Sequence, residues 1–434
     1  MNQNKFDINK FKPFRTSSGL DGNFTGLYED KLVRVIKRNN AEYKDILNFS
    51  DQLNDLVKSK LFYDDENFLV VEHEKLTNIT YFTEWTKKQK VAAAKTVVNL
   101  QSKLVGEGYY LNDPHAFNIT FKYHQPIYFD FGSIRKGKIT PSWWFIKCFC
   151  GWTEMDYWDS VLKINRIHKI WIAFRMGLSQ KPYEYLSNKL TKYEFYFAEK
   201  KIINLLNKKG FIGRLTRKVV NTLPFIFKNF SNWTDYEQKI PALNFDNERN
   251  KNILELFRKI KPQRILDIGA NKGVFSFLAL DNGVEEAIAL DLDNYSLDFL
   301  FNEAKKFDKK VTIAKLNIMS YPEKPGYYQS YIPVHERLNS DFTICLAVVH
   351  HVCYFGNFSF EVFAERLNRF ATKILIVEFV PYDDVHLTGP IYKGKDRSWY
   401  TLENFISAMK TRFPNEHEIF PSTPSPRVLI KFSK

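Results

Sequence analysis

One short segment of this sequence, together with an acid further along, has the spacing of a nucleotide-binding turn. The run RILDIGANKGVFSFLAL contains Asp267, Gly269, Asn271 and Gly273, and Asp291 follows 18 residues after Gly273. The two glycines let a ligand approach the backbone without a Cβ in the way. An acid at the position of Asp291 can accept hydrogen bonds from the hydroxyls of a ribose. Binding of a nucleotide-like ligand is the chemistry that this spacing predicts.

Two buried strands and a helix are needed to position these residues. The apolar residues around Asp267 predict one strand, those after Gly273 predict an apolar helix, and AIALDLD predicts a second strand ending near Asp291. The N-terminus of a helix that follows such a turn offers free N–H groups to a ligand. The sequence therefore predicts a unit of the doubly wound α/β class.

Polar side chains also follow three later apolar segments. Asn317 follows VTIAK, His350 and His351 follow SDFTICLAVV, and Glu378 lies at the end of KILIVE. Because parallel strands end at one edge of a doubly wound sheet, we expect these side chains at the same edge as the glycine turn. A histidine or carboxylate there can accept a proton from a substrate. The alternative, in which one histidine packs in the core and the other caps the loop, remains open.

The order of these segments resembles that of class I, Rossmann-type, S-adenosylmethionine-dependent methyltransferases from about Trp233 to Lys434. The pattern Asp-x-Gly-x-x-x-Gly resembles motif I of that family more closely than the Gly-x-Gly-x-x-Gly of dinucleotide enzymes, and RVLIKF fits its seventh, antiparallel strand. The resemblance implies a Rossmann-like seven-stranded sheet with S-adenosyl-L-methionine as the cofactor. The residues that it assigns to cofactor binding are Asp267, Gly269, Asn271, Gly273, Asp291 and Asn317.

Catalysis by such an enzyme requires the acceptor atom to be held in line with an activated methyl group and, for a hydroxyl acceptor, to lose its proton. His351 is the first candidate for the base and Glu378 the second, with His350 as a further candidate. All three follow predicted strands.

A second cluster lies in the N-terminal half. In GYYLNDPHAFNITFKYHQPIYFDFGSI, Asp113 precedes Asn118 by five residues, and Asp130 begins a D-F-G sequence. Protein kinases place a catalytic Asp and a magnesium-binding Asn in the same D-x-x-x-x-N register before a metal-binding D-F-G. The region from about 15 to 228 thus resembles the kinase-like fold of small-molecule and sugar kinases. The resemblance implies ATP and Mg²⁺ as candidate ligands, with Asn118 and Asp130 as metal ligands and Asp113 as a catalytic residue.

The same region departs from the kinase pattern. Gly19, Gly22 and Gly26 do not form a regular glycine-rich loop, and LVRVIKR only loosely resembles the strand that supplies a phosphate-binding lysine, for which Lys37 is the candidate. Asp and Asn residues also cap turns, so a structural role for Asp113, Asn118 and Asp130 remains an alternative. Whether this half transfers phosphate is open.

The positive charge of the chain is concentrated in its middle. Residues 135–228 contain 19 Lys and Arg but 6 Asp and Glu, a net charge of +13 out of the +14 of the whole chain. This aromatic-rich segment predicts helices. It can be an ordinary solvated exterior, an anionic-membrane contact or, less favoured, a nucleic-acid contact. We expect a kinase-like small lobe and catalytic-loop region over 1–140, a basic helical region over 141–230 and a methyltransferase domain over 231–434.

Other features bound the class of protein. The 434 residues favour at least two domains. Four irregularly spaced cysteines predict reduced thiols rather than a disulfide scaffold or a zinc site. The N-terminal residues lack the apolar core of a signal peptide, and no segment is apolar enough to span a bilayer. We therefore expect a cytoplasmic protein, with peripheral contact to the inner membrane face as an option.

Three hypotheses for function follow. The favoured one is O-methylation of a saccharide, glycan phosphate or related small molecule, because the whole chain, including DPHAFNI and the YTLENF stretch at Tyr400–Phe405, resembles bacterial methyltransferases related to nodulation host-specificity proteins. That resemblance implies polysaccharide biosynthesis, and a bifunctional enzyme if the kinase-like domain is active. The second is an RNA methyltransferase that uses the basic segment. The third is a binding scaffold with a degenerate kinase-like domain.

Overall fold

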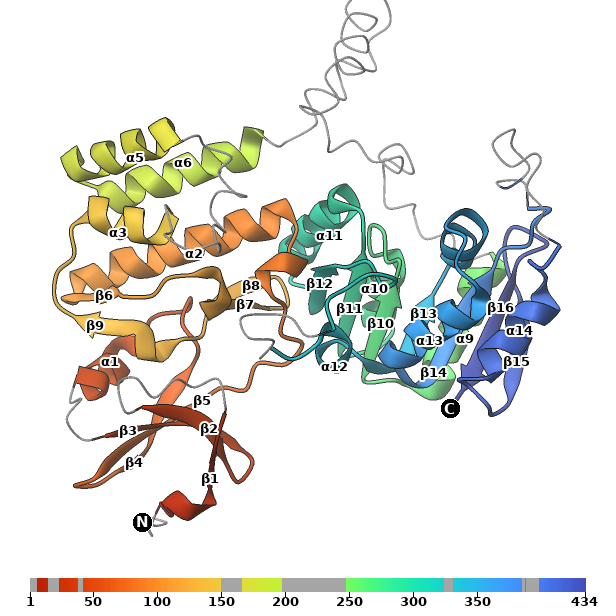
Figure 1. Cartoon of the computed structure of the whole chain (residues 1–434), viewed down its shortest axis with the longest axis horizontal. Helices are drawn as coiled ribbons and strands as arrows, with labels where there is room; N and C mark the ends of the chain where they lie inside the picture. Colours follow the sequence, from red (N-terminus) through yellow and green to blue (C-terminus); the bar gives the residue numbers. More distant parts are fainter. Residues whose placement is uncertain are drawn as a thin grey trace, which may run out of the picture. The chain divides into compact units, whose positions relative to one another are not determined.

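The computed structural model describes residues 6–14, 23–37, 42–149, 166–196, 247–323, 331–384, 387 and 398–434. These residues form two compact units, which Figure 1 shows from red to blue along the chain. Unit 1 draws its residues from Met1–Phe82 and Lys87–Val219, and unit 2 draws its residues from Thr83–Thr86 and Val220–Lys434. The expected boundary at 230/231 lies outside the described residues, as do Gly19, Gly22 and Cys150.

Unit 1 begins with a five-stranded antiparallel sheet whose strand order is β1-β2-β3-β5-β4. The strands are β1 (Phe11–Pro13), β2 (Phe24–Tyr28), β3 (Lys31–Lys37), β4 (Ser59–Asp64) and β5 (Phe68–His73). Between β3 and β4 the chain forms the helix α1 (Glu42–Ser50). Val33 and Val35 of β3 share one face of the strand and pack with Val70 of β5 in a small apolar core.

The remainder of unit 1 surrounds a buried helix, α2 (Lys87–Gly106). Apolar residues recur along α2 at three- and four-residue spacing, so Val91, Ala94 and Val98 are buried on one face. The helices of this part are α3 (Pro141–Phe149), α5 (Arg166–Leu178) and α6 (Pro182–Tyr196), of which α6 packs against α2, and α5 packs against α3 and α6 (Figure 1). The other elements are the antiparallel strand pairs β6 (Tyr109–Leu111) with β9 (Ile134–Lys136) and β7 (Ile119–Lys122) with β8 (Gln125–Tyr128).

Unit 2 contains a seven-stranded sheet with the order β12-β11-β10-β13-β14-β16-β15. Neighbouring strands are parallel except at β16, which is antiparallel to both β14 and β15. The predicted seven-stranded sheet with an antiparallel C-terminal strand is therefore confirmed. The strands are β10 (Arg264–Ile268), β11 (Glu286–Asp291), β12 (Val311–Lys315), β13 (Ser340–Cys345), β14 (Ala371–Phe379), β15 (His417–Pro421) and β16 (Val428–Ser433).

Consecutive residues of β10, β11 and β13 are buried, rather than every second one, because helices cover both faces of this sheet. Cys345 and Cys353 are buried free thiols in this core. The helical elements are α9 (Glu248–Ile260), α10 (Val274–Asp281), α11 (Asn294–Lys306), α12 (Val334–Arg337), the π-helical turn η7 (His350–Phe355), α13 (Phe360–Phe370) and α14 (Leu402–Lys410).

A four-residue piece of the N-terminal half, Thr83–Thr86, belongs to unit 2 by its contacts. Its carboxylate, Glu84, receives two hydrogen bonds from the guanidinium of Arg337, one of them over 3.1 Å from Nη1. Both side chains are more than nine-tenths buried. A buried bidentate pair is costly to break, since the remaining charge loses its partner in a poorly solvated place. The unit that contains the seven-stranded sheet thus includes a segment from outside the range 231–434.

Glu84→Gln should destabilise unit 2 by about 3 to 5 kcal/mol, because it leaves the Arg337 cation buried without an opposing charge. Hydrogen exchange of the α12 and β13 amides in the full chain measures the change. The control is Asp341→Asn, which removes the partner of the largely exposed Lys373 and should cost less than about 1 kcal/mol. Equal exchange in the two variants would show that the Glu84 pair adds nothing beyond a surface pair.

Candidate active site

The glycine turn lies where β10 ends and α10 begins. Gly269 has φ 78° and Gly273 has φ 77°, both in the left-handed region that favours glycine. A Cβ on Gly269 would lie 2.4 Å from Val348 Cγ2, and one on Gly273 would lie 2.3 Å from Leu300 Cδ1. The two glycines are therefore required by the backbone conformation and by close packing. Val348 belongs to the loop after β13, so that loop packs directly against the turn.

Asp291, at the end of β11, joins the turn to the loop that follows it. Its Oδ2 accepts a hydrogen bond from Asn271 N over 2.7 Å, and its Oδ1 accepts one from Asp293 N over 2.8 Å. Burial raises the pKa of this carboxyl, and the backbone N–H donors oppose that rise. Each oxygen has a second lone pair that remains suited to a ligand hydroxyl. The predicted residues Asn271 and Asp291 are thus brought together by a direct contact.

Leu292 is a candidate site residue that the sequence reasoning missed. Its side chain is 56% exposed although it follows directly after the buried strand β11. A large apolar side chain beside Asp291 offers a surface for the flat face of a base. The sequence could have indicated Leu292, because this leucine directly follows the acid that ends the strand and so lies outside the apolar pattern of the strand.

Asp267 lies beneath the turn rather than at the surface. Its side chain is buried, and its Oδ2 accepts a hydrogen bond of 2.8 Å from Ser276 Oγ in the first turn of α10. Burial raises the pKa of the Asp267 carboxyl to about 7, with the Ser276 hydrogen bond opposing the shift. The hydrogen bond from Ser276 to Asp267 holds α10 against the end of β10. Asp267 can therefore affect ligand binding only indirectly, through the conformation of the glycine turn.

Asn317 lies half-buried in the loop after β12. Its Oδ1 accepts a hydrogen bond of 3.0 Å from Met319 N, and its backbone oxygen accepts another from Ser320 N. Such a local side-chain contact closes a turn. In this structure the Asn317 side chain shapes its own loop.

His350 and His351 begin the π-helical turn after β13, with ring centroids 3.9 Å apart. His350 is buried, whereas His351 is half-buried. Burial, followed by the positive charge of Arg427, lowers the pKa of His351 to about 4. The imidazole of His351 is therefore neutral at pH 7 and able to accept a proton. π-Helical turns often occur at functional sites.

Arg427 is a second residue that the sequence reasoning missed. Its Nε donates to Asp384 Oδ2 over 2.7 Å and its Nη2 to Asp384 Oδ1 over 3.1 Å, and both side chains are buried. The antiparallel strand β16 starts at the edge where the parallel strands end, so the residue before Val428 must lie at that edge. The antiparallel strand in RVLIKF could have indicated this placement.

Glu378 has no exposed side-chain area. Its Oε1 accepts a hydrogen bond of 2.5 Å from Ser422 Oγ, and its Oε2 lies 3.7 Å from Arg249 Nη1. A proton acceptor must come within hydrogen-bond distance of its donor. The contacts of Glu378 are to α9 and to the β15–β16 turn, which makes His351 the better placed base.

In unit 1, Asn118 contacts both the backbone of Asp113 and the side chain of Asp130, whereas the Asp113 carboxylate is 57% exposed and lies beside His115. Asn118 Nδ2 donates to the backbone oxygen of Asp113 over 2.8 Å and to Asp130 Oδ2 over 3.3 Å. Asp130 Oδ1 accepts a hydrogen bond of 2.9 Å from Arg34 Nη2 on β3. A Cβ on Gly132 would lie 1.8 Å from Arg34 Nη1, so this glycine leaves room for the guanidinium.

Arg34, not Lys37, is the cation of β3 that faces this cluster. Side chains alternate between the two faces of a strand, so residues three apart point to opposite sides. Lys37 is exposed at the end of β3, and the Arg34 side chain is mostly buried. The period of two in LVRVIKR could have indicated Arg34. The predicted cofactor-binding residue Lys37 therefore points away from the Asp130 cluster.

The cluster as arranged does not fit a magnesium ion. Asp130 presents one oxygen to the Arg34 guanidinium and the other to the Asn118 amide, so both oxygens already have donors. Magnesium requires oxygen ligands in near-octahedral geometry. Among the described residues, no group of three or more His, Cys, Asp or Glu could hold a metal.

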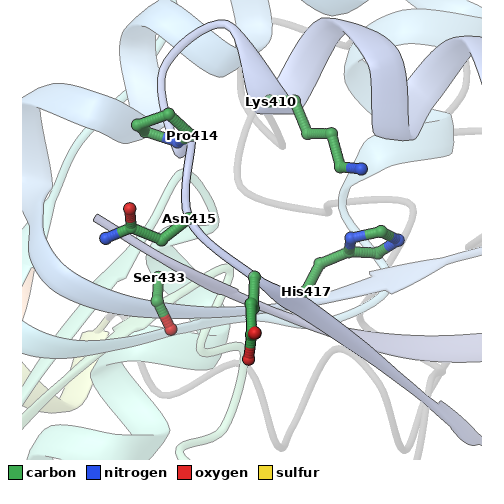
Figure 2. Close-up of a pocket in the computed structure, with 6 residues that line it drawn as sticks. Lys410, Pro414, Asn415, His417 and Ser433 are labelled. Carbon is green, nitrogen blue, oxygen red and sulfur yellow. The ribbon is translucent and has the colours of Figure 1, made fainter.

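Two cavities of unit 2 lie away from the glycine turn. One, of about 780 Å³, is lined by residues that include Lys410, Asn415, His417 and Ser433, which Figure 2 shows around it. The other, of about 790 Å³, is lined by residues that include Lys261 and Arg264. Arg264 starts β10 and His417 starts β15, so both cavities lie at the edge where the parallel strands begin. The candidate site residues lie at the opposite edge.

Comparisons with known proteins give one curated relative and many solved structures. The chain is 26% identical over 399 residues to the nodulation protein NoeA of Rhizobium meliloti strain 1021, covering 84% of this chain and 82% of that protein. No family model matches. The structure is similar to magnesium protoporphyrin IX methyltransferase from Synechocystis PCC 6803 with bound SAH (12% identity, 42% of this chain, 81% of that chain, TM-score 0.30). It is also similar to a putative O-methyltransferase from Nostoc punctiforme PCC 73102 (17% identity, 42% and 55%, TM-score 0.30).

An NMR titration of the His351 ring tests the electrostatics of this edge. We expect a midpoint near pH 4 in the unaltered chain and a higher midpoint in the double variant Arg427→Gln/Asp384→Asn. The double variant removes the cation that disfavours the imidazolium and leaves no buried carboxylate without its partner. His351→Gln identifies the signal. A midpoint near the ordinary value of about 6.5 in the unaltered chain would contradict the assignment.

Proposed function

We propose that unit 2 is an S-adenosylmethionine-dependent methyltransferase. The observation that carries the proposal is the contact of Asp291 with the glycine turn at the carboxyl edge of the sheet. Numbered along unit 2, the strand order is 3-2-1-4-5-7-6 with only the last strand antiparallel. This arrangement resembles the sheet of class I methyltransferases, and open α/β sheets bind ligands at the edge where Asp291 lies.

The residues at this edge fit the cofactor. Asp291 supplies oxygen acceptors for ribose hydroxyls, Leu292 supplies an exposed apolar surface for adenine, and Gly269 lets the backbone come close. The bound cofactor supplies an activated methyl group on a sulfonium. Asp267 keeps α10 and the turn in place through Ser276. Asn271 and Gly273 hold the conformation of the turn.

His351 acts as the base in this proposal. Its imidazole is neutral at pH 7 and offers a nitrogen lone pair to a proton, and because burial and Arg427 lower its pKa to about 4 it is a weaker base than a free imidazole. It would accept the proton of an acceptor hydroxyl during transfer of the methyl group that the bound cofactor would supply. His350, buried beside it, restricts the position of the ring. The Arg427 cation, held by Asp384, adds to the effect of burial in lowering the pKa of His351.

The acceptor that we propose is a hydroxyl of a saccharide, a glycan phosphate or a related small molecule. The similarity to a nodulation protein over most of both chains supports this class, as does the resemblance of the DPHAFNI and YTLENF segments. Removal of a hydroxyl proton by a neutral histidine suits O-methylation.

Unit 1 is, in our proposal, a kinase-like module that binds the phosphates of a nucleotide through Arg34. A small antiparallel sheet precedes a helical part, and Asp130 of the D-F-G sequence contacts both Arg34 and Asn118 of the D-x-x-x-x-N sequence. Arg34 Nε is buried without a hydrogen-bond partner among the described residues, which supports a need for a further acceptor beside the guanidinium. Whether the module also transfers phosphate to the acceptor of unit 2 separates a bifunctional enzyme from a binding module.

Asp291→Ala should weaken binding of S-adenosylmethionine by about 1 to 3 kcal/mol, because a charged acceptor is lost. Leu292→Ala should also weaken binding and leaves the turn intact. The matched control is Asp281→Ala, which removes an exposed carboxylate at the far end of α10. Isothermal titration calorimetry on the full chain measures all three. Unaltered affinity in both site variants would remove this edge from the cofactor site.

ATP should raise the melting temperature of unit 1 in the presence of a chelator, since Arg34 and not a metal supplies the positive charge. Arg34→Met should abolish the shift. Lys37→Met, which removes an exposed cation of the same strand, should retain it. Loss of the shift only in Lys37→Met would reverse the assignment, and no shift in the unaltered chain would contradict nucleotide binding by unit 1.

A further inference from the structure

The outer face of α5 in unit 1 exposes large apolar side chains. Trp171 and Phe174 are each 57% exposed, and Leu178 is 66% exposed. The spacing of three and four residues places them on one face of the helix. Trp171 and Phe174 contact each other edge to face, with ring centroids 5.8 Å apart. Large apolar side chains gathered in this way mark interaction sites more often than single exposed ones do.

The opposite face of α5 accounts for its position in the fold. Ile172, Ala173 and Met176 are buried, so the helix already has a packed side. The exposed face therefore is not needed for the core of unit 1. A helix with two apolar sides, one packed and one exposed, has more apolar surface than its own fold uses.

The neighbouring helix α3 adds a fourth exposed apolar side chain. A Cβ on Gly177 would lie 2.5 Å from Ser142 Oγ, which shows that α3 and α5 approach each other closely at this point. Trp143, the next residue of α3, is 56% exposed. Figure 1 shows α3 and α5 as neighbours within unit 1. The name α3–α5 face is used here for Trp171, Phe174 and Leu178 on α5 together with Trp143, an exposed side chain of the helix packed beside α5.

The charge around the α3–α5 face is positive. Arg175 is exposed between Phe174 and Leu178, and the Lys181 side chain, three residues after Leu178, is 78% exposed and pairs with the Glu184 carboxylate over 3.2 Å. The segment 135–228, to which these elements belong, carries a net charge of +13. Positive charge beside exposed tryptophan, phenylalanine and leucine is complementary to an anionic surface with an apolar interior.

We infer that the α3–α5 face docks unit 1 onto an anionic lipid surface. The apolar side chains enter the boundary between headgroups and acyl chains, and the cations contact the headgroups. A nucleic acid provides charge for the cations but no apolar layer for Leu178, which favours lipid. No helix among the described residues is long and apolar enough to cross a membrane.

Flotation of the full chain with phosphatidylcholine vesicles, with and without phosphatidylserine, tests the inference. We expect flotation only with the anionic vesicles at low salt, and release as salt rises, since exposed charges are screened within about 10 Å at 0.1 M. The variant Trp171→Ser/Phe174→Ser/Leu178→Ser should reduce the floated fraction at least about tenfold, because the apolar part of the binding is lost. The control Leu61→Ser changes an exposed leucine of β4 in the same unit and should float normally.

A second variant addresses the charge and preserves the apolar side chains. Arg175→Glu/Lys181→Glu should shift release to lower salt. In the unaltered chain, brominated lipids should quench tryptophan fluorescence, and the triple variant should lose part of that quenching. Failure to float, equal flotation of the triple variant, or RNA binding that the triple variant loses while vesicles are not bound would each overturn the inference.

Discussion

The carboxylate of Asp291 connects the two loops on which the candidate site of unit 2 depends. One oxygen receives the N–H of Asn271 in the glycine turn, and the other receives the N–H of Asp293, which itself caps α11. Burial raises the pKa of this carboxyl, so its charged form relies on those donors. The Asp291 side chain therefore connects the turn after β10, the end of β11 and the start of α11 by hydrogen bonds.

The loop after β13 is positioned by the same constraint. Val348 packs where a Cβ on Gly269 would otherwise lie, so the conformation of the turn and the place of His351 are linked. Arg427 directly precedes the antiparallel strand β16, which begins at this edge of the sheet. Its positive charge adds to burial in lowering the pKa of His351. The cofactor and acceptor sides of the proposed site therefore share one edge of the sheet.

The sequence predicted the elements whose signal is local. The strand, glycine turn and helix around Asp267 follow from apolar runs and glycines, whereas the seven-stranded sheet was implied by the resemblance of the chain to class I methyltransferases. Long-range partners were not predictable in this way. The pairing of Arg34 with Asp130 joins residues 96 apart, and the pairing of Glu84 with Arg337 joins residues 253 apart. The direction of a side chain at a strand end, as for Asp267, also depends on the helix packed over it.

A crystal structure of the full chain with S-adenosylhomocysteine tests the central claim, the cofactor site at the carboxyl edge of β10 and β11, most directly. The account predicts the ribose hydroxyls within hydrogen-bond distance of the Asp291 carboxylate and the adenine against Leu292. The contacts of Asp291 with Asn271 and Asp293 should remain. A product molecule bound at the opposite edge, in the cavity lined by Lys261 and Arg264, would contradict the account.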